Sequence, residues 1–166
     1  MQRQVDECLD HVLKGEDDQE KIKRLREWAK RSQIVVPMVR LGVGAEKVDW
    51  NLPEGMPETV KLDEDMPVGM GETTIALEWR RITKFFATDS NMNNLVDWKR
   101  EQQWVNLLEG LHPNESKIIT AIKDGTLLTL YPELEPILPE IGIKEYNAPV
   151  VQKKKRGRSR KKSEKK

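Results

Sequence analysis

The feature that most constrains the fold is a stretch of about forty residues without proline, in which apolar side chains recur at helical spacing. Residues 72–112 contain no proline and one glycine. Two rows of apolar residues lie in it: first Ile75, Trp79, Ile82 and Phe86, then Leu95, Trp98, Val105 and Leu108. Such spacing places each row on one face of a helix. The turn-forming run 87–94 separates the two helices, which we expect to pack as an antiparallel pair.

Shorter helices are expected before this pair. Residues 2–14 place their apolar side chains on one face of a helix. Asp17 or Asp18 is the expected N-cap of a second helix, whose outer surface is basic. Ser32 is expected to cap a third helix, which Pro37 weakens because only the first turn tolerates a residue without an N–H group.

The C-terminal third of the chain is expected to be more broken. His112 and Pro113 should begin a helix, because proline suits its first position. The apolar run 126–131 is short enough to form a strand or an extended segment. Three prolines between residues 132 and 139 should divide this last part of the body into short pieces.

The segment between the N-terminal helices and the proline-free stretch is irregular. Residues 50–71 hold three prolines and three glycines, which exclude a regular helix, so we expect a packed crossover or a binding loop. We therefore predict an all-α fold, a small bundle of about five or six helices over residues 1–146. It includes this irregular, acidic, Pro/Gly-rich crossover and is followed by a disordered basic tail at 147–166.

Charge divides the chain in the same way. The chain has 29 bases and 28 acids, a formal net charge of +1, yet ten of the bases and only one of the acids lie in residues 153–166. The remaining 152 residues hold 19 bases and 27 acids, a charge of −8, whereas the tail carries +9. The near-neutral total is thus an average over an acidic body and a basic tail.

Several functional classes find no support in the residues. One cysteine, Cys8, excludes an internal disulfide framework, and we expect it to be buried as a small apolar residue. No apolar run is long enough to span a membrane, and the N-terminus lacks the apolar core of a signal peptide. Glycine-rich nucleotide-binding motifs are missing from the sequence. We expect no enzyme activity, cofactor, small-molecule substrate or membrane partner.

The residues with the most catalytic character have simpler interpretations. His112 can cap the helix that begins after it, with Glu115 in the first turn; a catalytic or metal role is the alternative. Asp63, Glu64 and Asp65 are adjacent, and adjacent side chains of an extended chain point to opposite sides, so we expect no metal site there. Most tryptophans lie on apolar rows and should be buried.

The chain resembles one protein family. The segments 50–57, 76–86, 91–127 and 138–143 look like an uncharacterised family of small proteins encoded by large tailed phages, especially myoviruses of marine bacteria and cyanobacteria. The most specific matches are Arg100–Glu101, Trp104–Val105, Leu107–Leu108–Glu109, Leu111–His112–Pro113 and Ile122–Lys123–Asp124. The resemblance covers about residues 15–143 and implies no established activity. The basic tail lies outside it.

The tail is the segment with the clearest functional pattern. Its cations cannot be neutralised by a single acid, and such runs bind polyphosphates with release of counterions. The predicted nucleic-acid-binding residues are Lys153, Lys154, Lys155, Arg156, Gly157, Arg158, Arg160, Lys161, Lys162, Lys165 and Lys166. Arg156, Gly157 and Arg158 weakly resemble the AT-hook, a reader of the minor groove, with Ser159 in place of its proline.

These observations predict a non-enzymatic phage accessory protein whose tail binds nucleic acid, DNA in preference to RNA, and whose body binds a protein. Trp104 is the tryptophan we expect at the surface, and with Lys99 and Arg100 it forms the predicted protein-binding group. The expected location is the cytoplasm of the infected bacterial host. A protein-interaction module that binds no nucleic acid, a minor virion-associated protein, and a tail that only solubilises the chain or docks on the acidic body are the alternatives.

Overall fold

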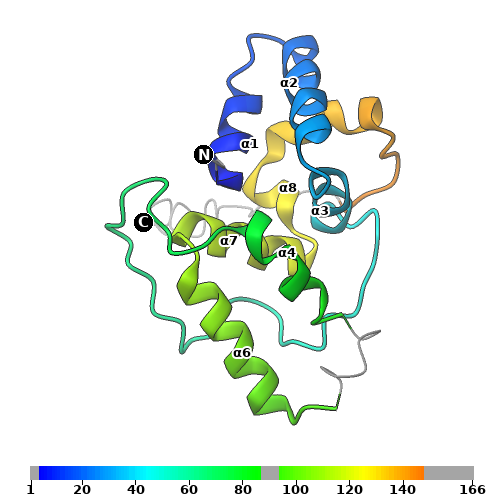
Figure 1. The fold of residues 1–166 in the computed structure, drawn as a ribbon. Coiled ribbons are helices and arrows are strands. Elements are labelled where there is room, and N and C mark those ends of the chain that lie inside the picture. The colour runs from blue at the N-terminus through cyan, green and yellow to red at the C-terminus, as the bar shows by residue number, and fades with distance from the viewer. Residues whose placement is uncertain (1–3, 87–93, 148–166) are drawn as a thin grey trace, which may run out of the picture.

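The computed structural model describes residues 4–86 and 94–147, and within these residues every regular element is a helix (Figure 1). The elements are α1 (Val5–Leu13), α2 (Asp18–Arg31), α3 (Val35–Gly42), α4 (Ile75–Thr83), α6 (Asp97–Gly110), α7 (Pro113–Asp124), α8 (Leu127–Leu130) and the 3₁₀-helix η1 (Pro132–Ile141). The predicted all-α class is confirmed. No helix in the described ranges is long and apolar enough to cross a membrane.

Local capping explains where several of these helices begin and end. The Asp17 carboxylate accepts a hydrogen bond from the Glu20 N–H at 2.8 Å, and the Thr74 hydroxyl accepts one from the Leu77 N–H. Gly125 ends α7 in the left-handed conformation, with φ of 70°, which glycine adopts without steric cost. The expectation for Ser32 is wrong, because it is the C-cap of α2 and α3 begins three residues later.

The C-terminal third is more helical than expected. The run 126–131 is not a strand: its centre forms α8, and the chain continues into η1. Pro136 and Pro139 lie inside η1. Proline has no N–H group to donate to an α-helical hydrogen-bond ladder, and here the chain forms the tighter 3₁₀-helix instead. Leu134, Ile137 and Leu138 are buried, so the apolar contacts of this segment hold it against the bundle.

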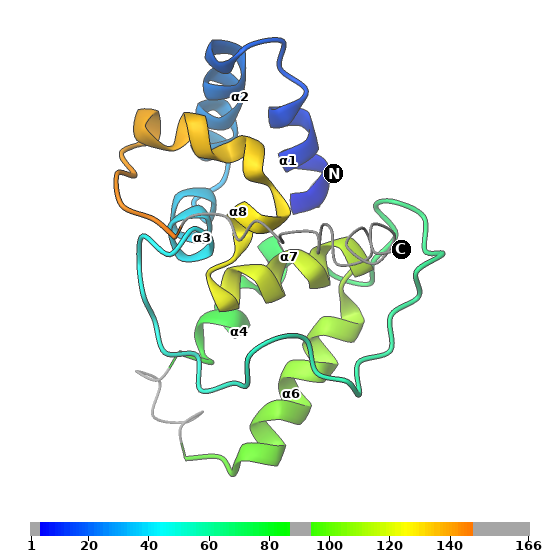
Figure 2. The same ribbon diagram turned by 180° about the vertical axis from the view of Figure 1, so that it is seen from behind.

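The helices form two linked groups. One group contains α1, α2 and η1, with α2 packed between the other two, and it is joined through α8 and α3 to α7 (Figure 1). The second contains α7 and α6, and α6 projects away from the first group in both views (Figures 1 and 2). The expected antiparallel pairing of α4 with α6 is wrong, since the main helical neighbour of α6 is α7.

The irregular segment between α3 and α4 is a packed crossover that runs along α6 and α7 (Figure 2). Lys123 of α7 donates to the Pro53 carbonyl at 2.7 Å, and the Gly55 N–H donates to Asp124 at 3.0 Å. Farther along, the Lys61 N–H donates to Glu109 of α6. These bonds satisfy backbone groups that a long loop would otherwise leave to solvent.

Candidate functional site

The predicted nucleic-acid-binding residues, 153–166, lie outside the described residues, so the structure neither supports nor contradicts their role. The predicted protein-binding residues Lys99, Arg100 and Trp104 all lie in α6. They do not form one surface, because only Lys99 is exposed.

Trp104 is in the core, and the expectation of an exposed Trp104 is wrong. Its side chain is 1% exposed and lies in an aromatic cluster with Trp50, Phe85 and Phe86. The Phe85 and Trp104 ring centroids are 5.0 Å apart at 73°, an edge-to-face arrangement that stabilises aromatic pairs. This cluster fastens the crossover and the end of α4 to α6.

Arg100 is buried as well, and it anchors the crossover. Its guanidinium donates to the Asn51 carbonyl at 2.8 Å and to the Leu95 carbonyl at 3.1 Å, and it pairs with Asp97. A buried arginine is tolerated because several acceptors satisfy its charge and its donors. Arg100 therefore connects α6 to the crossover and is not available as part of an exposed binding surface.

Trp98 is the tryptophan at the surface of α6, with 67% of its side chain exposed. It lies two residues before Arg100, which places it on nearly the opposite face of the helix. Lys99 Nζ lies 5.5 Å from the Trp98 ring centroid, and Val96 beside them is 53% exposed. Val96, Trp98 and Lys99 form the surface that we call the α6 edge, which is both apolar and cationic. The apolar pattern had placed Trp98 in the core, whereas Lys99 was predicted to be exposed.

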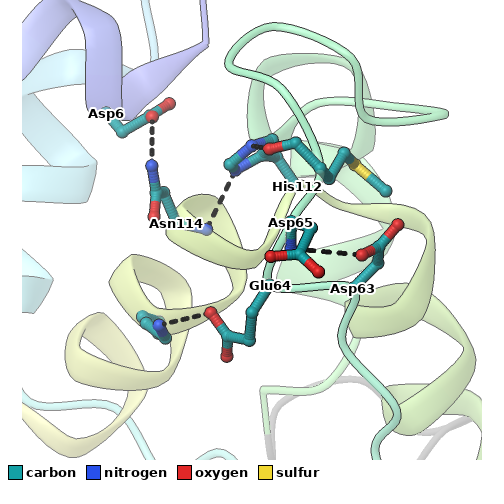
Figure 3. Close-up of polar contacts among 8 residues, drawn as sticks. Asp6, Asp63, Glu64, Asp65, His112 and Asn114 are labelled. Carbon is teal, nitrogen blue, oxygen red and sulfur yellow. Dashed lines mark hydrogen bonds and ion pairs between the residues drawn. The ribbon is translucent and has the colours of Figure 1, made fainter.

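His112 has the expected capping role. Its Nδ1 accepts the Asn114 N–H at 3.1 Å, and its Nε2 lies 3.0 Å from the Met66 carbonyl and donates to it (Figure 3). The Asn114 amide in turn donates to Asp6 of α1. His112 thus joins the first turn of α7 to the crossover and, through Asn114, to α1. Both of its ring nitrogens are used in these contacts.

Glu115 lies at the junction of three helix N-termini. Its side chain is completely buried, and it accepts the N–H of Val5 at 2.9 Å and the N–H of Ile75 at 3.4 Å. Those are the first residues of α1 and α4, and Glu115 is itself in the first turn of α7. One carboxyl group therefore satisfies donors that two helix starts leave unpaired.

Burial has a measurable chemical consequence for Glu115. Loss of solvation raises the pKa of its carboxyl group to about 7, against the opposing hydrogen bonds from Val5 and Ile75. Asp6 raises this pKa further, and His112 lowers it. The sequence did contain a signal for this position, since Glu115 continues the buried row of Ile118, Ile119 and Ile122 on α7.

The acidic run of the crossover does not converge on one point. Glu64 pairs with Lys117 of α7 at 3.0 Å, whereas Asp63 accepts the Asp65 N–H (Figure 3). Across residues 4–86 and 94–147, no group of three or more His, Cys, Asp or Glu side chains is arranged to hold a metal ion. Glu64 connects the crossover to α7, and Asp63 makes a local contact within the crossover.

These features describe a small helical protein with an anchored crossover and an exposed aromatic edge. Residues 8–129 match a family of unknown function, DUF6433, and the chain belongs to this family. The match includes α2 to α7, the crossover and both His112 and Glu115. No curated protein and no solved structure matches the chain.

Proposed function

We propose that the chain is a non-enzymatic accessory protein of a phage, with a body that binds a protein partner and a tail that binds nucleic acid. The observation that carries the proposal is the separation of charge, +9 in residues 153–166 and −8 in the rest. An acidic body repels phosphate groups, so the tail is the part of the chain suited to bind them. The site of action would be the cytoplasm of the infected bacterial host.

One feature of the tail sequence favours DNA over RNA as its ligand. Arg156, Gly157 and Arg158 provide two cations around a residue without a side chain, which suits the narrow minor groove of A·T-rich duplexes. Ser159 does not restrict the backbone as proline would, so we propose shallow groove contact with little sequence preference.

The test compares the full chain with two variants. One lacks residues 153–166, and the other keeps the length of the tail but carries glutamine at its ten basic positions. Binding to duplex DNA and to single-stranded RNA is measured by fluorescence anisotropy across a salt series. The full chain should bind DNA with a slope of about −0.9 per phosphate contacted, and both variants should lose binding. Unchanged affinity and slope in either variant contradicts the proposal.

The protein-binding part of the proposal is supported by the α6 edge. Tryptophan is enriched among the residues that contribute most to protein binding, and Trp98 is exposed at this edge. Lys99 adds a charge that selects the partner. Replacing Trp98 by alanine should abolish recovery of the partner from infected cells, whereas Leu77→Ala, at another exposed apolar residue, should not. Equal recovery by the two variants would place the interface elsewhere.

The second candidate is a protein-interaction module that binds no nucleic acid, whose tail contacts an acidic partner. Nuclease treatment of the same pull-down separates the two. Loss of the partner after nuclease favours the nucleic-acid-bound complex, and retention favours the module. Particle proteomics tests the remaining alternative, a minor virion component.

A further inference from the structure

The first helical group contains a pocket that the proposed function does not use. It has a volume of about 320 Å³ and lies between α1 and α2, and Ile34 and Ala76 also line it. Both views show α1 and α2 side by side (Figures 1 and 2). The volume lies at the lower end of the range for small-molecule sites, which is roughly 300–1,000 Å³.

The pocket combines an apolar floor with a basic mouth. Val5 and Val12 of α1 and Trp28 of α2 supply apolar surface, while Arg24 and Arg31 provide two cations against one acid, Glu27. The helix that carries these arginines has six bases and three acids, although the body as a whole is acidic. An anion in this region therefore meets positive potential that most of the body does not offer.

The two arginines differ in availability. Arg24 donates to the His11 carbonyl at 2.7 Å and pairs with Glu20 at 2.9 Å, so its position is fixed. The guanidinium of Arg31 makes no hydrogen bond or ion pair with any part of the chain that the structure describes, and it is exposed at the pocket mouth. Arg31 is thus placed to bind an acidic group of a ligand, and Arg24, whose position is fixed, adds to the positive potential at the pocket.

We propose that this pocket binds a small amphipathic anion, with its apolar part on Trp28, Val5 and Val12 and its carboxylate or similar group at Arg31. This departs from the expectation that no small molecule binds. Sequence periodicity shows which residues share a helix face, but it does not show that two helices leave a space between them. The inference does not depend on the tail or on nucleic acid.

The single cysteine of the chain makes the test direct, because Cys8 lines this pocket. The probes are 2-naphthoate, its uncharged analogue 2-naphthalenemethanol, and inorganic phosphate. The readout is the rate at which iodoacetamide alkylates Cys8 in the full-length protein. We expect 2-naphthoate to slow alkylation with saturation, the alcohol to act more weakly, and phosphate to have no effect.

Two variants and a control complete the experiment. Arg31→Gln should weaken 2-naphthoate about three- to fivefold, as expected for loss of one exposed ion pair. Lys23→Gln removes the same charge from α2 outside the pocket and should leave the affinity unchanged. Ala76→Phe should fill the pocket and prevent saturable protection, with circular dichroism checking that each variant is folded. Absence of saturable protection in the unmodified chain, or equal effects of Arg31→Gln and Lys23→Gln, overturns the proposal.

Discussion

Replacing Glu115 by glutamine tests whether this buried carboxyl group makes stability depend on pH. Its pKa in the folded chain is about 7, above the ordinary value of 4.5, because burial disfavours the charged form. Between these pH values the folded chain keeps a proton that the unfolded chain has released. The contribution of the protonated Glu115 to the free energy of unfolding is therefore fully present below pH 4.5, and it is lost as the pH rises through 7. At about 1.4 kcal/mol per pH unit, the loss is about 3 kcal/mol.

Glutamine has nearly the same shape as glutamate and does not ionise. Its side-chain oxygen can still accept hydrogen bonds from the N–H groups of Val5 and Ile75. The Glu115→Gln protein should therefore keep these hydrogen bonds, and residue 115 should no longer make its stability depend on pH. Glu115→Ala is the matched control, because it leaves both donors buried without an acceptor. We expect Glu115→Ala to be less stable than Glu115→Gln by about 1–3 kcal/mol per donor at every pH, because neither side chain ionises.

The assay is urea unfolding followed by circular dichroism and tryptophan fluorescence, between about pH 5 and about pH 8. Asp6 and His112, which face Glu115, are unchanged in all three proteins, so the differences report on residue 115. The free-energy difference between wild type and Glu115→Gln should shift by about 2.5 kcal/mol in favour of glutamine between about pH 5 and about pH 8. A difference that stays constant over this range refutes the reasoning.

Three further predictions concern the anchors of the fold. Trp104→Ala should destabilise the chain by about 3–5 kcal/mol through loss of the aromatic cluster, whereas Trp98→Ala should cost less than about 0.5 kcal/mol; urea unfolding measures both. Arg100→Ala removes the donors to the Asn51 and Leu95 carbonyls, so limited proteolysis should cut the crossover faster than in wild type. Cleavage at the wild-type rate would contradict this prediction. Gly42→Ala places a methyl group 2.7 Å from Leu127 Cδ2 and should cost about 1–3 kcal/mol, seen as a lower Tm; an unchanged Tm would show that Leu127 moves aside freely.

The parts of the fold that depend on neighbouring residues were predictable from the sequence. Asp17 and His112 cap their helices as expected, because a cap needs only a side-chain acceptor two or three residues before a donor. The helical class follows in the same way from apolar spacing. The exception is η1, where three prolines suggested breaks and the chain instead formed a 3₁₀-helix.

The parts that depend on distant residues were not predictable. The faces of α6 show this most clearly, since Trp98 and Trp104 both fall on or beside the apolar row of this helix, yet one is exposed and the other is buried. Arg100 is buried because the crossover brings the Asn51 carbonyl to it from 49 residues away. Cys8, expected to be buried, instead lies partly exposed in the pocket between α1 and α2.

The sequence alone determined the helical class, the capped ends of several helices and the separation of a basic tail from an acidic body. These properties follow from composition and from interactions over a few residues. The tertiary structure decided which face of α6 is exposed, that Glu115 serves three helix starts at once, and that α1 and α2 leave a pocket with Arg31 at its mouth. Burial and proton affinity depend on which groups pack opposite a side chain, and those groups are distant in the sequence.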